Sequence, residues 1–145
     1  MSTRDYDTDF YAWTQAQVDA LRAKDWAAVD LEHVIEEIAD LGNEQRHAVE
    51  SHLRILLAHL LKWRYQSQRR RRSWQTSVLN ARTEITRRLE RNPSLQHTWP
   101  EMLAWAYPKA RQLAASETGL PREIFPEACP WTIAQLQDED FLPEA

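Results

Sequence analysis

Apolar residues recur every three or four positions along most of the chain, which is the spacing of a helix with one buried face. The first such run predicts a helix over about residues 8–23, with Asp7 as its N-cap. No stretch alternates apolar and polar residues for long enough to indicate a strand, so the pattern predicts an all-α protein. The apolar anchors of the first helix are Phe10, Trp13, Val18 and Leu21.

The longest apolar stripe predicts one long helix over about residues 30–66, with Asp30 as its N-cap. The stripe runs from Leu31 to Trp63 and keeps a single phase across Gly42. We therefore place Gly42 inside the helix or at a shallow bend, where its missing side chain would let another helix approach closely. In the alternative, the helix ends there, with Gly42 just after its last residue. A continuous helix would be on the order of 50 Å long, so it must bend, protrude or pack along a partner.

Two further helices are predicted after the long one. The third covers about residues 74–91 and has Ser73 as its cap. The fourth starts at Thr98, with Pro100 in its first helical position. Pro108 lies inside the fourth helix and predicts a kink, because proline has no N–H to donate to the preceding turn.

The C-terminal part of the chain is rich in proline. Gly119 and Pro121 end the fourth helix, and the following residues form an irregular segment around one short helix. Thr132 and Gln135 have the spacing of a capping box at the start of that short helix. The predicted architecture is a single helical bundle built around the long helix and closed by an irregular, proline-rich C-terminal segment.

Composition narrows the class of protein. A chain of 145 residues corresponds to one domain, over residues 1–145. One cysteine excludes a disulfide framework and a cysteine zinc cluster, and two glycines argue against glycine-rich phosphate loops. The N-terminal residues have no signal-peptide pattern, and no apolar run approaches the roughly 20 residues of a membrane span. We expect a cytoplasmic protein without a membrane partner.

Several short segments, in this order, resemble one bacterial family, number 29 of the domains of unknown function. The resemblance extends from about residue 6 to residue 143 and implies an all-helical fold and a bacterial cytoplasmic setting. It carries no established activity, so it assigns no catalytic residue. The segments are DWAAVDLE (25–32), VIEEIADLG (34–42), LLAHLLKW (56–63), RSW (72–74), FP (125–126), CPWT (129–132) and DFLP (140–143).

The side chains that could carry chemistry do not form a recognisable set. His52 and His59 lie at the edge of the long stripe, where the simpler interpretation is two partly buried histidines. Glu44 and His47 match half of a di-iron signature, but no second half exists. Cys129 is interpreted as small, buried and unreactive. We predict no catalytic residue, no cofactor and no metal, which favours a protein that is not an enzyme.

Charge is strongly segregated along the chain. Residues 62–91 contain ten basic and two acidic side chains, a net charge of +8, whereas residues 1–61 carry −7 and residues 92–145 carry −5. At least two of the four consecutive arginines should be exposed, because successive loop residues point in different directions. The candidate residues for binding an anion or a partner are Arg69, Arg70, Arg71, Arg72, Arg87, Arg88 and Arg91.

Two hypotheses of function remain. In the first, the chain is a helical interaction or regulatory protein that forms a homo-oligomer, such as a dimer, or binds another protein. Its arginines would then meet an acidic face of a second subunit. In the second, it is an RNA- or DNA-binding accessory module that uses the basic segment 62–91. The sequence pI of about 5.7 disfavours the second, because nucleic-acid-binding domains are usually basic.

Overall fold

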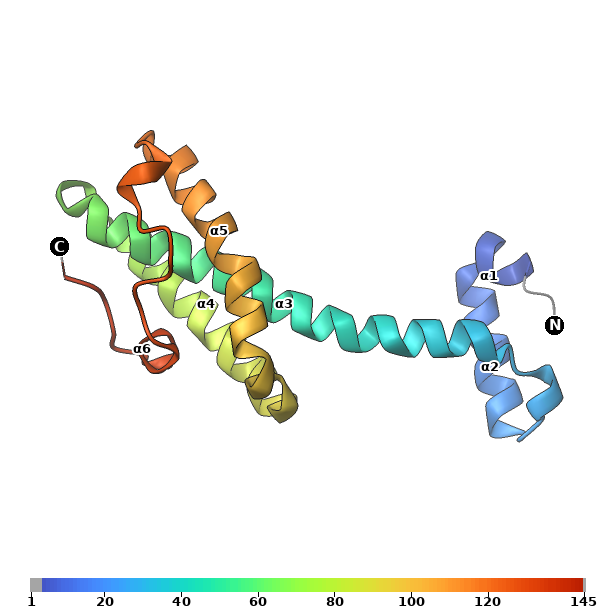
Figure 1. Cartoon of the computed structure of the whole chain (residues 1–145). Helices are drawn as coiled ribbons and strands as arrows, with labels where there is room; N and C mark the ends of the chain where they lie inside the picture. The colour runs from blue at the N-terminus through green and yellow to red at the C-terminus, as the bar shows by residue number, and fades with distance from the viewer. Residues whose placement is uncertain (1–3, 145) are drawn as a thin grey trace. The chain divides into compact units, whose positions relative to one another are not determined.

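The computed structural model describes residues 4–144, and every regular element within them is helical (Figure 1). Six α-helices follow one another, joined by short 3-10 turns, so the predicted all-α class is confirmed. The chain divides into two compact units, residues 1–44 and residues 45–145. The expectation of one domain over residues 1–145 stays a prediction. None of the described helices is long and apolar enough to cross a membrane.

The N-terminal unit begins with two helices where the sequence predicted one. Helix α1 (Arg4–Thr8) and helix α2 (Phe10–Arg22) are separated by Asp9. The Asp9 carboxylate accepts a hydrogen bond of 3.1 Å from the backbone N–H of Ala12 and so caps α2. The prediction of Asp7 as the cap is therefore wrong: Asp7 is in the last turn of α1, and the break falls two residues later.

Helix α3 (Leu31–Tyr65) is the predicted long helix, continuous over 35 residues. Asp30 caps it as expected: its carboxylate accepts a hydrogen bond from the backbone N–H of His33, and its carbonyl accepts one of 3.0 Å from Val34. Gly42 lies inside the helix, which confirms that the chain does not break there. A Cβ added at Gly42 would meet no described atom within 4 Å, so no helix of the described chain approaches closely at this position.

The C-terminal unit contains the hydrophobic core. It packs the second part of α3 with α4 (Arg72–Arg91), α5 (Trp99–Thr118) and the short α6 (Ile133–Gln137). The apolar stripe that sequence periodicity placed on the long helix is buried here from Val49 to Leu60, and Trp63 at its end is half-buried. Core side chains with almost no exposure include Val49, Leu53, Leu56, Leu57, Leu60 and Leu61 of α3, Met102, Ala106 and Ala110 of α5, and Leu136 of α6.

Two predicted helix starts are displaced, that of α4 by two residues and that of α5 by one. Helix α4 begins at Arg72, and the residue in its N-cap position is Arg71, whose side chain makes no capping bond, so Ser73 is not the cap. Helix α5 begins at Trp99, which places Pro100 in the second helical position. Ser73 and Pro100 lie in the first turns of α4 and α5. Backbone N–H groups in a first turn have no acceptor within the helix, so these displacements change the stability of the helices little.

The predicted ends of the remaining elements are confirmed. Gly119 ends α5 with a left-handed backbone, φ +75°. Thr132 and Gln135 form both hydrogen bonds of a capping box at the start of α6, at 3.1 Å and 2.9 Å. Helix α5 continues through Pro108. The kink predicted there stays a prediction.

Candidate functional site

Four consecutive arginines lie where the chain passes from α3 to α4; we name residues Arg69–Arg72 the arginine turn. After Tyr65 the chain makes one 3-10 turn (Ser67–Arg69) and two extended residues before α4 begins. Arg69, Arg71 and Arg72 are exposed and Arg70 is half-buried. The prediction that at least two of the four are exposed is therefore confirmed.

Arg70 differs from its neighbours because its guanidinium is used inside the protein. Its Nε donates a hydrogen bond of 2.8 Å to the main-chain carbonyl of Trp63, and its guanidinium carbon lies 4.5 Å from the centre of the Trp63 ring. These two contacts fold the turn back onto the last turns of α3. Arg70 is thus a residue that positions the other arginines rather than one available to a ligand.

The arginines near the end of α4 form a separate group. Arg87 donates to Glu84 at 2.9 Å, and Arg88 donates to the side-chain oxygen of Gln45 at 3.1 Å. Arg91 is exposed. At about 1.5 Å per helical residue, Arg87 lies on the order of 20 Å along α4 from Arg72. The seven candidate arginines therefore do not form one patch.

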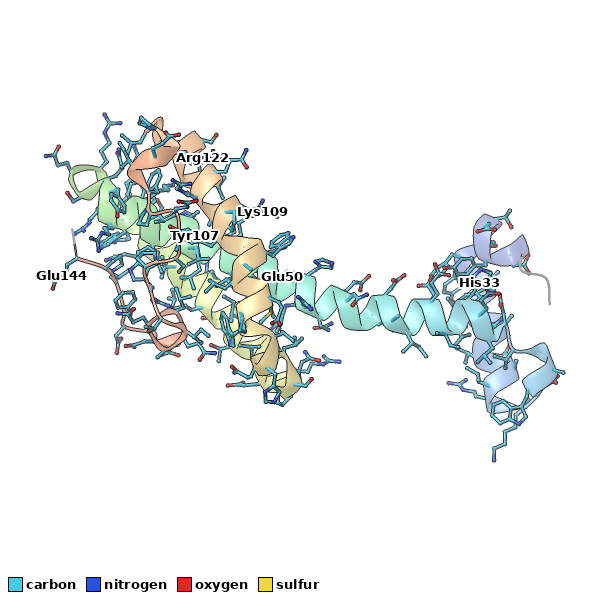
Figure 2. All side chains as sticks on the ribbon, in the orientation of Figure 1. His33, Glu50, Tyr107, Lys109, Arg122 and Glu144 are labelled. Carbon is cyan, nitrogen blue, oxygen red and sulfur yellow. The ribbon has the colours of Figure 1, made fainter. Side chains whose placement is uncertain are left out.

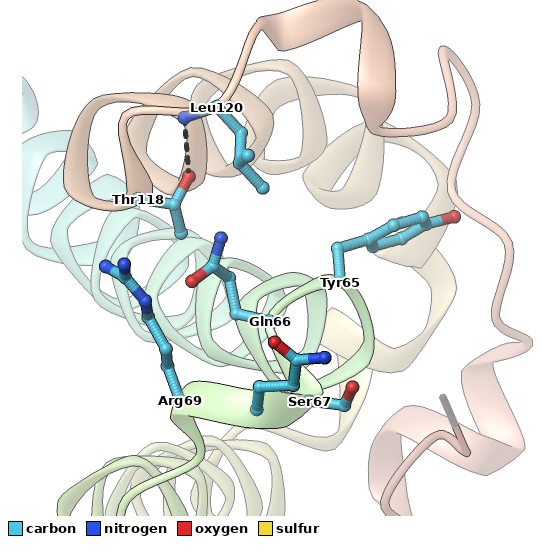
Figure 3. A pocket seen from close by; sticks show the side chains of 7 residues that line it. Tyr65, Gln66, Ser67, Arg69, Thr118 and Leu120 are labelled. Carbon is cyan, nitrogen blue, oxygen red and sulfur yellow. Dashed lines mark hydrogen bonds between the residues drawn. The ribbon is translucent and has the colours of Figure 1, made fainter.

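A hollow of about 410 Å³ opens between the chain following α3 and the end of α5 (Figure 3). Tyr65, Gln66 and Arg69 line it from one side, and Thr118 and Leu120 line it from the other. The Thr118 hydroxyl donates to the carbonyl of Ala114 at 2.7 Å and accepts from the backbone N–H of Leu120 at 3.2 Å, so it is used within the fold.

A smaller hollow of about 180 Å³ adjoins the first and shares Gln66, Arg69 and Thr118 with it. Its other lining residues include Lys62, Arg71, Trp74 and Glu117. The Lys62 amine is hydrogen-bonded to Glu117 at 2.7 Å and lies 4.7 Å from the centre of the Trp74 ring. Sequence reasoning missed Lys62 and Glu117, because they are 55 residues apart and no local pattern connects them.

The first part of α3 carries a second surface of interest. Its apolar side chains are about 60% exposed, although they continue the stripe that is buried further along the helix. We name this set the α3 apolar face. The α3 apolar face consists of Leu31 (63% exposed), Ile35 (59%), Ile38 (63%) and Leu41 (61%).

A cluster of polar and aromatic side chains fixes the start of α3 (Figure 2 labels His33). The Asp30 carboxylate accepts a hydrogen bond of 3.0 Å from the Trp13 indole and lies 2.7 Å from Nδ1 of His33. The Tyr6 ring stacks on His33 with ring centres 3.9 Å apart, and the Tyr6 hydroxyl is hydrogen-bonded to Glu37. The hydrogen bond that His33 donates to Asp30 raises the pKa of His33.

The remaining titratable candidates have structural surroundings. Nδ1 of His59 lies 2.9 Å from the carbonyl of Ile55, and burial lowers the pKa of both His59 and His52. Burial also raises the pKa of the half-buried Cys129 thiol, which favours the unreactive thiol form. Among residues 4–144, no three His, Cys, Asp or Glu side chains are grouped so that they could hold a metal ion.

These features define a small all-α protein with an exposed apolar helix face in one unit and a basic, hollowed turn in the other. The chain belongs to the family described as Domain of unknown function DUF29, whose model matches residues 6–142. This agrees with the resemblance carried by its sequence motifs. No curated protein and no solved structure matches the chain.

Proposed function

We propose that this chain is a non-enzymatic helical interaction protein that self-associates through the α3 apolar face. The observation that carries the proposal is the exposure of this face, because soluble monomers rarely leave a contiguous apolar stripe in water. Nine of the eleven large hydrophobic side chains that are exposed in the described residues lie between Phe10 and Leu41. The apolar surface is therefore concentrated in the N-terminal unit.

A second copy of the same face is the occupant that we infer. The spacing of residues along this helix face is the same when it is read from either end. Intervals of four, three and four residues separate Leu31, Ile35, Ile38 and Gly42. Two antiparallel copies would place Ile35 of each chain against Ile38 of the other, and Leu31 against Gly42. Such pairing uses the same patch on both chains, as two-fold dimers do, and the glycine would admit the larger side chain.

The available burial suits a weak dimer. Burying one Leu or Ile side chain fully contributes about 1.5–3 kcal/mol. Eight side chains from two copies, each about 60% exposed, would together contribute on the order of 10 kcal/mol. Association itself costs about 4–15 kcal/mol in lost freedom. We therefore expect a dimer that forms as the protein concentration rises rather than an obligate one.

The net charge of the N-terminal unit determines whether added salt strengthens or weakens the dimer. Residues 1–44 contain three basic and eleven acidic side chains, a net charge of −8. Two acidic units repel each other, and salt screens that repulsion, so added salt should strengthen the dimer. If instead the arginine turn of one copy met the acidic residues of another, added salt would weaken association.

Sedimentation velocity across a range of protein concentrations tests the proposal. The variant Ile35→Gln/Ile38→Gln should stay monomeric where the unsubstituted chain dimerises. Its matched control is Leu79→Gln/Ile124→Gln, which removes two exposed apolar side chains from the C-terminal unit and should dimerise normally. A chain that remains monomeric at every concentration, or a control that loses association equally, would refute self-association through the α3 apolar face.

A role as an RNA- or DNA-binding accessory module is the second candidate. It is favoured by Arg69, Arg71 and Arg72, which are exposed and make no ion pair within the described part of the chain. Nucleic acid that copurifies and is removed by a high-salt wash would support it. Changing all four residues of the arginine turn to Gln should then flatten the plot of log affinity against log salt. The slope should fall by about 0.7–0.9 for each lost phosphate contact.

A further inference from the structure

The two adjoining hollows at the arginine turn together have the volume of a small-molecule site. Their volumes are about 410 and 180 Å³, and Gln66, Arg69 and Thr118 belong to the lining of both. Ligand pockets in proteins commonly range from about 300 to 1,000 Å³. Both hollows lie within the C-terminal unit. The larger one, drawn in Figure 3, lies between the end of α3 and the end of α5, and the smaller one is also lined by Arg71 and by Trp74 of α4.

The charges of the smaller hollow do not cancel. It is lined by three cations, Lys62, Arg69 and Arg71, and by one carboxylate, Glu117. Lys62 is only 7% exposed and is hydrogen-bonded to Glu117 at 2.7 Å, so these two charges offset each other. The guanidinium groups of Arg69 and Arg71 make no ion pair within the described residues. The hollow therefore carries two uncompensated positive charges.

Contacts of the neighbouring residues fix the backbone that carries the two arginines. Arg70, which lies between Arg69 and Arg71, is anchored on Trp63 by a hydrogen bond of 2.8 Å and by ring contact. Arg71 occupies the N-cap position of α4 with extended backbone, and its side chain makes no capping bond. The Lys62 amine over the Trp74 ring forms one wall of the hollow.

We propose that the two hollows form one binding site for a small phosphate monoester. A phosphate monoester carries a charge of about −1.5 to −2 at neutral pH, which matches the two uncompensated arginines. Guanidinium groups bind phosphate oxygens through paired hydrogen bonds, and Gln66 adds an amide N–H₂ at the junction of the hollows. The larger hollow, with Tyr65 and Leu120 in its lining, receives the organic part of the ligand.

A compact ligand fits these observations better than a polynucleotide does. The Glu117 carboxylate faces the same hollow, so additional phosphates along a strand would meet a negative charge. The arginines of α4 that could extend a phosphate track lie on the order of 20 Å further along that helix. One of them, Arg88, is already hydrogen-bonded to Gln45.

Titration calorimetry with inorganic phosphate and with phenyl phosphate tests the site, with chloride at equal ionic strength as the reference. Phenyl phosphate should bind one per chain and more tightly than inorganic phosphate, because its ring enters the larger hollow. The variant Arg69→Gln/Arg71→Gln should bind phenyl phosphate at least tenfold more weakly. An unchanged thermal midpoint would show that this variant is folded.

The matched control is Arg87→Gln/Arg91→Gln, which changes the net charge equally but lies outside both hollows. It should keep its affinity for phenyl phosphate within about twofold, because its charges lie on the order of 20 Å away. Absence of saturable binding by the unsubstituted chain, or an equal loss in both variants, would overturn the proposal. So would tighter binding of a single-stranded oligonucleotide with a salt slope corresponding to several phosphates.

Discussion

The guanidinium of Arg82 donates a hydrogen bond of 2.7 Å to the main-chain carbonyl of Phe141, 59 residues further along the chain. The same side chain also donates to the carbonyls of Leu136 at 3.0 Å and Gln135 at 3.2 Å. Arg82 is only 3% exposed, so a buried charge links α4 to the C-terminal segment. Buried backbone carbonyls need hydrogen-bond donors, and Arg82 supplies donors to these three carbonyls of the C-terminal segment.

Substitution of Arg82 by Gln should destabilise the protein by about 2–4 kcal/mol, because buried carbonyls lose their donors. Arg82→Lys should destabilise the protein less than Arg82→Gln does. The charge is kept, but one amine cannot reach all three carbonyls as the guanidinium group does. Urea unfolding followed by circular dichroism measures the loss. Arg87→Gln, at an exposed position of the same helix, should change stability by less than about 0.5 kcal/mol. Similar midpoints for the Arg82 and Arg87 variants would contradict this role.

Asp30→Ala should weaken the start of α3 by about 1–2 kcal/mol, because it removes the N-cap acceptor together with the partner of Trp13 and His33. Amide hydrogen exchange over residues 31–37 should accelerate accordingly. Asp30→Asn should retain most of the cap, since Asn and Asp cap about equally well. Asp25→Ala is the control, because Asp25 stands before a 3-10 turn without a side-chain capping bond. Equal effects at the two positions would argue against the cap.

The N-terminal unit should become more stable as the pH falls through neutrality. The hydrogen bond that His33 donates to Asp30 raises the pKa of His33 above its usual 6.5. A group whose pKa is higher in the folded state than in the unfolded state stabilises the fold. This stabilisation is complete below the pKa of the unfolded state and is lost as the pH rises through the pKa of the folded state. Hydrogen exchange in residues 31–37 at pH values on both sides of 6.5 measures the effect, and His33→Gln should abolish it. A flat profile for the unsubstituted chain would contradict the predicted ion pair.

At lower pH the same cluster should weaken again. Burial by itself would raise the pKa of Asp30, but the hydrogen bonds from His33 and Trp13 outweigh it and lower the pKa below 3.8. A group whose pKa is lower in the folded state than in the unfolded state also stabilises the fold. This stabilisation is present above the pKa of the unfolded state and is lost as the pH falls through the pKa of the folded state. The start of α3 should therefore show its greatest protection between about pH 4 and pH 6.5.

The C-terminal unit should respond to pH in the opposite direction. Burial lowers the pKa of both His52 and His59 below 6.5, so the unfolded chain takes up protons first as the pH falls. This unit should lose stability as the pH drops from 6.5 through the folded values. Nuclear magnetic resonance titration of the imidazole C–H signals should show both pKa values below that of His33. An order with His33 lowest would contradict both assignments.

The two glycines of the chain should respond oppositely to alanine. Gly42→Ala should stabilise the monomer by about 0.5–1 kcal/mol, because Gly42 is helical and an added Cβ meets open space. Gly119→Ala should destabilise it by about 1–2 kcal/mol, because φ is +75° there. Thermal unfolding at low protein concentration measures both changes.

Gly42→Ala also tests the proposed pairing of α3. A methyl group opposite Leu31 of the second copy would crowd the interface, so this variant should dimerise more weakly although its monomer is more stable. Sedimentation velocity measures the dimer, and Gly119→Ala is the control because it lies in the other unit. Unchanged association of Gly42→Ala would argue against the antiparallel register.

Most of the helices could be predicted from the sequence, since their signals are local. The Asp30 cap, the capping box of Thr132 and Gln135, and the stop at Gly119 all depend on residues within four positions of one another. The error at Asp7 arose because Asp9, an equally suitable cap, stands two residues later. At Ser73 the local preference for a serine cap was not followed, since α4 begins at Arg72 and Arg71 in the cap position makes no capping bond. The hollows could not be predicted, because Lys62 meets Glu117 across 55 residues.

Local patterns in the sequence are enough to predict the all-α class, the start of the long helix and the run of four arginines in a turn. The tertiary structure settles which part of one continuous apolar stripe is covered: Leu53 is fully buried, whereas Ile38 is 63% exposed. It also decided that Arg70 and Arg82 are used within the fold while Arg69 and Arg71 line a hollow. Helical periodicity reflects contacts within a turn, whereas burial depends on segments that are distant in sequence, which no local pattern records.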